Sequence, residues 1–306
     1  RRSSDLFSGN GEIGVMARGF PHTEVLHFSH AELHLPVART DKPLEMAHHM
    51  PMLRQLCLDG EFKRASMIID EIREKEGTKM VDNDPFIGAF QLQVAHEGAA
   101  GEEKPDDYQR SIDFMSGVTS VEFSDKAGTL RRDVFASRPD GLTVFRIKSA
   151  KPRKTTLRIA PNPWDGADQW IQDGVKSLEG SVEGDALRFS LRFRHKSHCN
   201  TLRGLEAAVR IITPDGVSAA GENGVEFTAR DALVLVNLRP VRENEQFDAV
   251  FAELSGTLAG IEESYGTLLA RHAKIHGDMM GRVSFSLGAP AADRAKSTDA
   301  LNEHSF

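Results

Sequence analysis

The dominant pattern along the chain is an alternation of apolar and polar residues with period two. It is clearest at 187–194, where leucine and phenylalanine alternate with arginine and serine, and it recurs at 90–94 and 283–287. Successive side chains of a β-strand point to opposite faces, so this period predicts half-buried strands. Further strands are predicted at 12–18, 23–28, 108–115, 118–123, 129–136, 142–148, 156–160, 205–212, 225–229 and 233–238.

Turn-forming residues separate these strands. They stand at 124–128 (Ser-Asp-Lys-Ala-Gly), 138–141 (Arg-Pro-Asp-Gly) and 214–216 (Pro-Asp-Gly). No helical pattern alternates with the strands, which favours antiparallel over parallel pairing. We therefore predict a mainly β chain: a large antiparallel β-sandwich (super-sandwich) with a short helical insertion and a C-terminal helical linker.

Two regions have a helical period instead. Residues 51–77 predict two short helices, because Pro51 suits a helix start and Gly60 and Gly77 suit helix ends. Residues 246–279 carry apolar side chains at steps of three and four, with glycines that could divide them into two helices. This apolar stripe comprises Phe247, Val250, Phe251, Leu254, Leu258, Ile261 and Leu268.

Composition narrows the possible partners. The 306 residues are within range for one large all-β sandwich, and the net charge of -7 argues against binding to nucleic acid or to anionic membranes. No apolar run approaches the ~20 residues of a membrane helix. Cys57 and Cys199 lie far apart and do not have a metal spacing; they could be free or bridged. The compartment, whether secreted, periplasmic or cytoplasmic, stays undetermined.

Two stretches resemble nucleotide- or metal-binding motifs, but neither kind of site is favoured. Residues 9–14 match the dinucleotide pattern G-x-G-x-x-G, but no strand precedes them and no helix follows, so a glycine-rich turn is favoured. The six histidines between positions 22 and 49 lack the spacing of a zinc helix. Histidines that line a polar pocket or face solvent are favoured over a metal site. Neither a metal nor a cofactor is predicted.

The two tryptophans lie close together in a loop-like stretch. Trp164 and Trp170 flank acidic residues at 161–170, and Trp164 suits a sugar-stacking platform. A tryptophan that anchors the loop to the sandwich is the more frequent case. Glycoside hydrolysis needs two carboxylates beside the scissile bond, but carboxylates are too abundant here for the pattern to select a pair.

Five stretches (9–16, 54–65, 108–114, 132–140, and His272 with 282–288) resemble, in this order, the N-terminal domain of glycoside hydrolase family 95, the α-L-fucosidase family. The most specific is 132–140 (Arg-Asp-Val-Phe-Ala-Ser-Arg-Pro-Asp), which is similar to the family's Arg-x-Val-Phe-Ala-Ser-x-Pro-Asp hairpin. The others are the Gly-Asn-Gly opening at 9–16, a helix at 54–65, a tyrosine-led strand at 108–114, and a helix-then-strand exit that includes His272 and 282–288. Together they span residues 9–288.

The resemblance implies a domain order. It places a sandwich at 1–242 with an insertion at 51–77, a helical linker and exit strand at 243–288, and a tail at 289–306 leading to an absent (α/α)6 catalytic domain. In the family this barrel holds the general acid and the groups that position the attacking water, and the reaction inverts the anomeric centre. We therefore expect a non-catalytic sandwich domain, inactive alone, that serves a carbohydrate-cleaving enzyme.

Two further expectations follow from that domain order. The linker helices would pack largely on the barrel, so the apolar stripe should be partly uncovered in this chain. Large apolar side chains left in water forfeit ~1.5–3 kcal/mol each. The chain should therefore tend to self-associate. The alternative is a stand-alone carbohydrate-binding or interaction module. No catalytic residue can be carried over from the family.

The candidate substrate-binding residues come from a departure from the family pattern. Where the family often has Leu-Asn-Glu-Asp-Thr-Leu-Trp near the domain junction, this chain has Phe-Ser-His-Ala-Glu-Leu-His at 28–34. We take His30, Glu32, His34 and Trp164 as candidates, with a plain surface role for Glu32 as the alternative. The histidines leave L-fucose, galactose-configured sugars and plant polymers all open as substrates.

Overall fold

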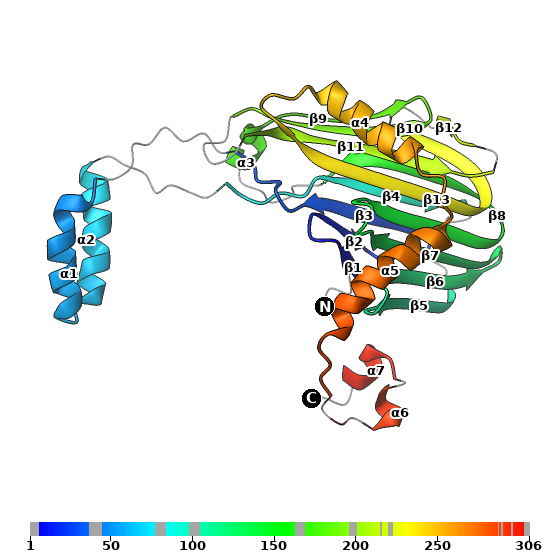
Figure 1. Ribbon diagram of the computed structural model, residues 1–306, viewed down its shortest axis with the longest axis horizontal. Coiled ribbons are helices and arrows are strands. Elements are labelled where there is room, and N and C mark those ends of the chain that lie inside the picture. The colour runs from blue at the N-terminus through cyan, green and yellow to red at the C-terminus, as the bar shows by residue number, and fades with distance from the viewer. Residues whose placement is uncertain are drawn as a thin grey trace.

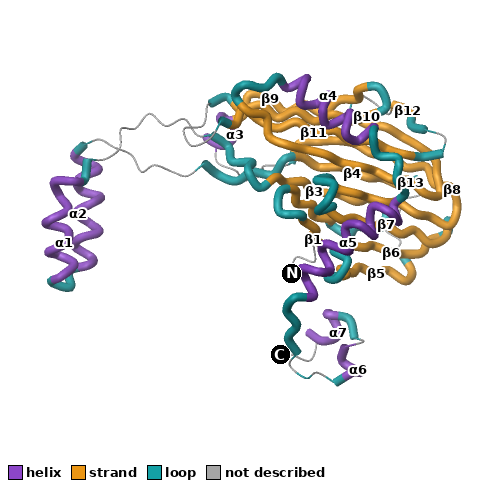
Figure 2. Tube along the Cα trace, viewed as in Figure 1, coloured by secondary structure: helices purple, strands orange, loops and turns teal. Residues whose placement is uncertain are grey.

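The fold was analysed in a computed structural model (Figures 1 and 2). The structure describes residues 6–36, 45–76, 84–97, 105–162, 169–195, 201–214, 216–219, 223–286, 288, 290–294 and 296–302. Trp164, Cys199 and the predicted helix end at Gly77 lie outside these residues. Cys57 is a free, exposed cysteine.

Thirteen strands are joined by antiparallel pairing into one sheet that folds into two layers, as the alternation predicts. The strands are β1 (Leu6–Gly9), β2 (Ile13–Ala17), β3 (Thr23–His30), β4 (Phe90–His96), β5 (Asp106–Asp113), β6 (Val118–Asp125), β7 (Gly128–Ala136), β8 (Thr143–Pro161), β9 (Val175–Glu183), β10 (Ala186–Phe193), β11 (Leu202–Ile212), β12 (Ser218–Ala219) and β13 (Gly224–Arg242). The mainly β sandwich is confirmed.

The two longest strands connect the layers. The first half of β8 pairs with β7, whereas residues from Thr155 onward pair with β4. β13 follows β8 along both halves, with a register shift between Ala229 and Asp231. The sequence predicts two strands in place of each. This was wrong because each of the two strands continues, without a turn, through the register shift between them.

Apolar side chains from the two layers meet in one core. Phe90 of β4 lies 4.7 Å from Phe28 of β3 in its own layer and 5.2 Å from Phe189 of β10 in the opposite layer, measured between ring centroids. All three rings are buried. Aromatic contacts at these separations stabilise a core beyond their burial.

The helices that the structure describes lie outside this core. They are the one-turn 3₁₀ helix η1 (Ala47–His49), then α1 (Met50–Leu58), α2 (Phe62–Lys75), α3 (Gln169–Gly174), α4 (Phe247–Ala259), α5 (Tyr265–Gly281), α6 (Ala291–Arg294) and α7 (Thr298–Asn302). The two predicted helices of the insertion are α1 and α2. Pro51 stands in the first turn of α1, and Gly60 follows it with a φ of 78°.

The apolar stripe is more covered than expected: six of its seven side chains are buried and Phe251 is partly buried, while self-association stays a prediction. α4 packs on the outer face of β11 and β13 (Figure 1), and Phe247, Val250, Leu254 and Leu258 are buried there. Leu268 of α5 and Ile261 are buried in the same cluster, with Phe251 partly buried against it. The outer face of these strands is itself apolar, so the sandwich covers the stripe without another domain.

The predicted exit strand at 283–287 was also wrong. Residues 283–286 are in neither helix nor strand, and Val283 and Phe285 are 82% and 84% exposed. Alternation alone does not make a strand, because a strand needs a partner for its backbone groups. The expected division into a sandwich, a linker and a tail stays a prediction.

Candidate functional site

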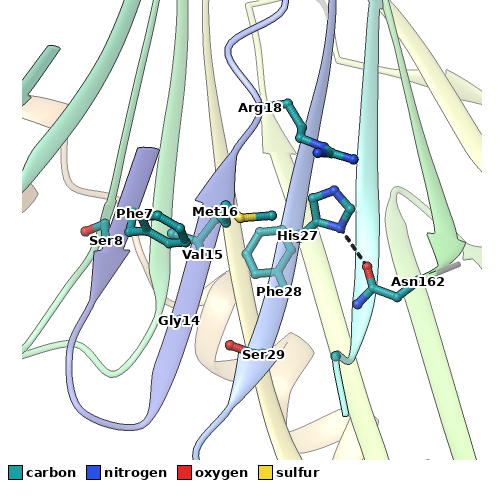
Figure 3. Close-up of a pocket in the computed structure, with 11 residues that line it drawn as sticks. Phe7, Ser8, Gly14, Val15, Met16, Arg18, His27, Phe28, Ser29 and Asn162 are labelled. Carbon is teal, nitrogen blue, oxygen red and sulfur yellow. Dashed lines mark hydrogen bonds between the residues drawn. The ribbon is translucent and has the colours of Figure 1, made fainter. Parts of the chain in front are cut away.

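A pocket of about 470 Å³ opens on the outer face of the layer formed by β1, β2, β3 and β4 (Figure 3). Its size falls within the range of about 300–1,000 Å³ that small-molecule sites occupy. It is lined by Phe7, Ser8, Gly14, Val15, Met16, Arg18, His27, Phe28, Ser29, Gly88 and Asn162.

Strand register places its central side chains in one row. Phe7 of β1 is opposite Met16 of β2, and Met16 is opposite His27 of β3. His27 in turn is opposite Gln91 of β4. Because alternate residues of each strand point into the core, these side chains share the outer face. Phe7 is 61% exposed, so its ring is open to a ligand.

Two glycines keep the neighbouring part of the pocket open. A Cβ atom added at Gly14 would lie 2.8 Å from Oγ of Ser29, and one at Gly88 would collide with the amide group of Asn162. Any larger residue would displace these polar groups. The pocket therefore has an apolar wall of Phe7 and Met16 and a polar wall of Ser29, His27 and Asn162.

His27 and Asn162 form the best-defined polar contact of the pocket. Nδ1 of His27 lies 2.8 Å from the side-chain amide of Asn162. Both ends of the amide have partners when its nitrogen donates to His27 and its oxygen accepts from the backbone N–H groups of Phe90 (3.2 Å) and Ala89 (3.3 Å), and one N–H of the amide is then left over. This arrangement leaves the imidazole proton on Nε2 of His27. Nε2 itself is buried and has no hydrogen-bond partner among the residues that the structure describes.

Three of the predicted residues, His30, Glu32 and His34, lie at or just beyond the adjoining end of β3 and outside the pocket lining. His30 is 6% exposed and faces the interior side of the strand, and its Nδ1 accepts a hydrogen bond from the backbone N–H of Glu32 (3.2 Å). Burial lowers the pKa of His30 from its ordinary value. Its neutral form is therefore favoured.

Glu32 and His34 belong to the segment that continues from His30. Glu32 is half exposed and pairs with Arg242 at the end of β13 (2.6 Å). His34 forms an isolated antiparallel bridge with Phe86, and their ring centroids lie 5.6 Å apart. Their role in substrate binding, like that of His30 and Trp164, stays a prediction.

Sequence reasoning missed the pocket residues. Phe7, Met16, His27 and Ser29 come from three strands, and only the register brings them together. One signal was available: Asn162 lies in the Pro-Asn-Pro-Trp stretch that drew attention to Trp164, two residues away.

Among the residues that the structure describes, no three His, Cys, Asp or Glu side chains form a group that could hold a metal ion. No described helix is long and apolar enough to span a membrane.

Comparison with known families identifies the sandwich. The model of "Glycosyl hydrolase family 65, N-terminal domain" matches residues 4–239, well over half of the chain. The chain belongs to this family. The match runs from β1 into the last strand, β13, and ends before α4. The predicted glycoside-hydrolase N-terminal domain is confirmed in this broader form.

Curated relatives are named as fucosidases. "Probable alpha-fucosidase A" of Aspergillus oryzae (strain ATCC 42149 / RIB 40) is 28% identical over 154 residues, which cover 46% of this chain and 19% of the relative. "Alpha-L-fucosidase 2" of Arabidopsis thaliana is 20% identical over 310 residues, which cover 93% of this chain and 35% of the relative. The matched regions therefore span about a fifth to a third of the length of these proteins.

A solved structure named "Putative kojibiose phosphorylase from human microbiome" shares 14% identity at a TM-score of 0.44. The matched region covers 62% of this chain and 28% of the chain in that structure.

Proposed function

We propose that this chain is the non-catalytic N-terminal sandwich domain of a family-95-like glycoside hydrolase. The enzyme would hydrolyse α-L-fucosides or α-L-galactosides with inversion, with its catalytic residues outside these 306 residues. The observation that carries the proposal is the family match, joined to two relatives named as fucosidases that are each far longer than the matched region.

An exposed apolar surface supports a partner domain. The C-terminal half of α5 carries Ile275, Met279 and Met280, which are 42%, 46% and 42% exposed. Met115 of the β5–β6 turn adjoins them: its Cε would lie 3.8 Å from a Cβ atom at Gly281, and it is 53% exposed. Contiguous exposed apolar side chains of this kind mark interaction sites. We assign this α5 surface to contact with a helical catalytic domain.

The second candidate is a stand-alone carbohydrate-binding module. Burial of the α4 stripe within the chain's own fold favours it, because α4 then needs no second domain to cover it. The pocket on β1–β4 would be its binding site. The α5 surface favours the first candidate, because it leaves several large apolar side chains in contact with water.

Enzyme assays separate the two candidates. The 306-residue chain and a longer polypeptide that contains it would be assayed on 4-nitrophenyl α-L-fucopyranoside and α-L-galactopyranoside. The proposal expects turnover with inversion by the longer protein and none by the chain alone. Turnover by the chain that is lost when one of its own acids is mutated would overturn it. So would a well-folded longer protein that is inert on both glycosides.

A further inference from the structure

The pocket on β1–β4 combines features that suit a sugar ring. Its apolar wall presents the exposed ring of Phe7 and the side chain of Met16. Its polar wall presents the hydroxyl of Ser29 and the amide of Asn162, which is bonded to the imidazole of His27. A pyranose has the matching chemistry: a face of C–H groups that packs on aromatic and thioether side chains, and a rim of hydroxyls that both donate and accept hydrogen bonds.

We propose that this pocket binds one pyranose ring of a glycan, with the C–H face of the ring against Phe7 and Met16 and its hydroxyls toward Ser29 and the amide of Asn162, which His27 orients. This gives the sandwich a ligand of its own. The inference rests on the proposed function for the choice of a sugar as the ligand class.

Pre-organisation of the polar wall supports this assignment. Asn162 is held by the backbone of β4, and it fixes the ring of His27 through Nδ1. The fixed pair is ordered before a ligand arrives, so little side-chain entropy is lost on binding. Ser29 lies beside the glycine at position 14, where the absence of a side chain leaves room for the ring.

Charge favours a neutral ligand over a phosphorylated one. Arg18 is the only charged residue among the eleven lining residues that the structure describes, and it also has an interaction partner within the protein. A phosphate site commonly has several cationic groups or a helix N-terminus directed at the anion. The strands of this face supply no helix N-terminus to the pocket.

Binding should be weak, because the pocket is open to solvent and one ring buries little surface. We would titrate the 306-residue chain with methyl α-L-fucopyranoside and methyl α-D-glucopyranoside up to about 50 mM, well above the roughly millimolar dissociation constant expected. Saturation-transfer NMR and calorimetry would report binding. At least one glycoside is expected to bind.

Two variants and a matched control test the location. Phe7→Ala and Asn162→Ala should weaken binding about tenfold or more, a change equivalent to about 1.4 kcal/mol. Phe114→Ala removes a ring that is 66% exposed, comparable to Phe7 at 61%, but lies outside the pocket, and it should leave binding unchanged. Circular dichroism would confirm that all three variants are folded.

The inference is overturned if neither glycoside binds, or if folded Phe7→Ala and Asn162→Ala bind as tightly as the unchanged chain. These outcomes are separate from the test of the proposed function. A longer protein could hydrolyse fucosides while the pocket binds no sugar, and the chain could bind a sugar while the longer protein is inert.

Discussion

The backbone N–H of Arg138 donates a hydrogen bond to Nδ1 of His272 (3.2 Å). Arg138 lies in the turn after β7, and His272 lies on α5 and is only 1% exposed. The guanidinium Nε of Arg138 also donates to Nδ1 of His276 (3.3 Å), and Nε2 of His276 contacts the carbonyl of Phe114 (3.0 Å). Both Nδ1 atoms face groups that can only donate, so each accepts a hydrogen bond, and this favours the neutral form of the buried His272. This contact fixes α5 against the sandwich.

The neutral state of His272 predicts a loss of stability in acid. Burial first, and then the charges of His276 and Arg138, lower the pKa of His272 to about 4 from an ordinary value near 6.5; Asp140 and the backbone of Ser116 oppose the shift. Between these pH values the unfolded chain binds the proton and the folded chain does not. The contribution of His272 to the free energy of unfolding is therefore fully present above about pH 6.5. It falls by about 2–3 kcal/mol as the pH is lowered toward 4.

Urea unfolding of the chain and of His272→Gln at pH 4.5 and 7.5 would measure this contribution. The variant should show a smaller difference between the two pH values than the unchanged chain. His96, whose pKa burial and nearby arginines lower to about 3, remains in both proteins and contributes equally. An identical difference in the two proteins would show that His272 does not titrate in this range.

A buried ion pair predicts a large effect of removing one charge. Glu24 and Arg132 are both 1% exposed, and their Oε2 and Nη2 atoms lie 3.3 Å apart. Burial raises the pKa of Glu24, which Arg132 opposes, and burial lowers the pKa of Arg132. Glu24→Gln can keep the hydrogen bonds that Oε1 accepts from the backbone of Gly19 and Val25 (2.9 Å each), but it leaves the guanidinium unpaired. We expect a loss of about 3–5 kcal/mol in the free energy of unfolding.

The double variant Glu24→Gln/Arg132→Met is the informative partner of this experiment. It removes the unpaired charge, so it should be less destabilised than Glu24→Gln alone. Chemical denaturation of the unchanged chain, of Glu24→Gln, of Arg132→Met and of the double variant gives the comparison. A double variant with the summed loss of the two single changes would indicate that the two residues act independently.

Packing of α4 on the sandwich predicts a cavity effect. Leu258 is 1% exposed in the cluster between α4 and β13, and its carbonyl accepts from the guanidinium of Arg210 (2.7 Å). Leu258→Ala should lower the free energy of unfolding by about 2–5 kcal/mol. Thr257→Ala, at the neighbouring exposed position, serves as the control and should change it by less than about 0.5 kcal/mol. Equal losses would mean that α4 is not packed as described.

Glu32 should affect activity more than stability, if the proposed function holds. Its ion pair with Arg242 joins two half-exposed side chains, and such pairs contribute about 0–1 kcal/mol. In a longer active protein, Glu32→Ala should lower kcat/KM with little change in melting temperature. Arg242→Ala breaks the same ion pair but keeps the carboxylate of Glu32. If Glu32 contacts the substrate, Arg242→Ala should therefore lower kcat/KM less than Glu32→Ala does. Unchanged kinetics for Glu32→Ala would assign Glu32 to the surface alone.

Local patterns were sufficient to predict most strands. At 187–194 the alternation of apolar and polar residues identified β10 almost residue for residue, because one of its faces is buried and the other is not. The glycine at position 60 marked the end of α1 because it adopts a positive φ, which is a property of the local backbone alone. Such features are readable because the forces that fix them are short-ranged.

The sequence by itself thus determined the mainly β class, the helical insertion and, more broadly than family 95, a glycoside-hydrolase N-terminal domain. The tertiary structure decided the rest. Whether the apolar stripe of α4 was covered depended on the outer faces of β11 and β13, which contribute apolar residues such as Ala208 and Leu235. The pocket depended on register, because Phe7 and Asn162 are far apart along the chain and meet only through strand pairing across β1, β2, β3 and β4. Periodicity reports which face of a strand is buried, but only long-range packing determines which strands become neighbours.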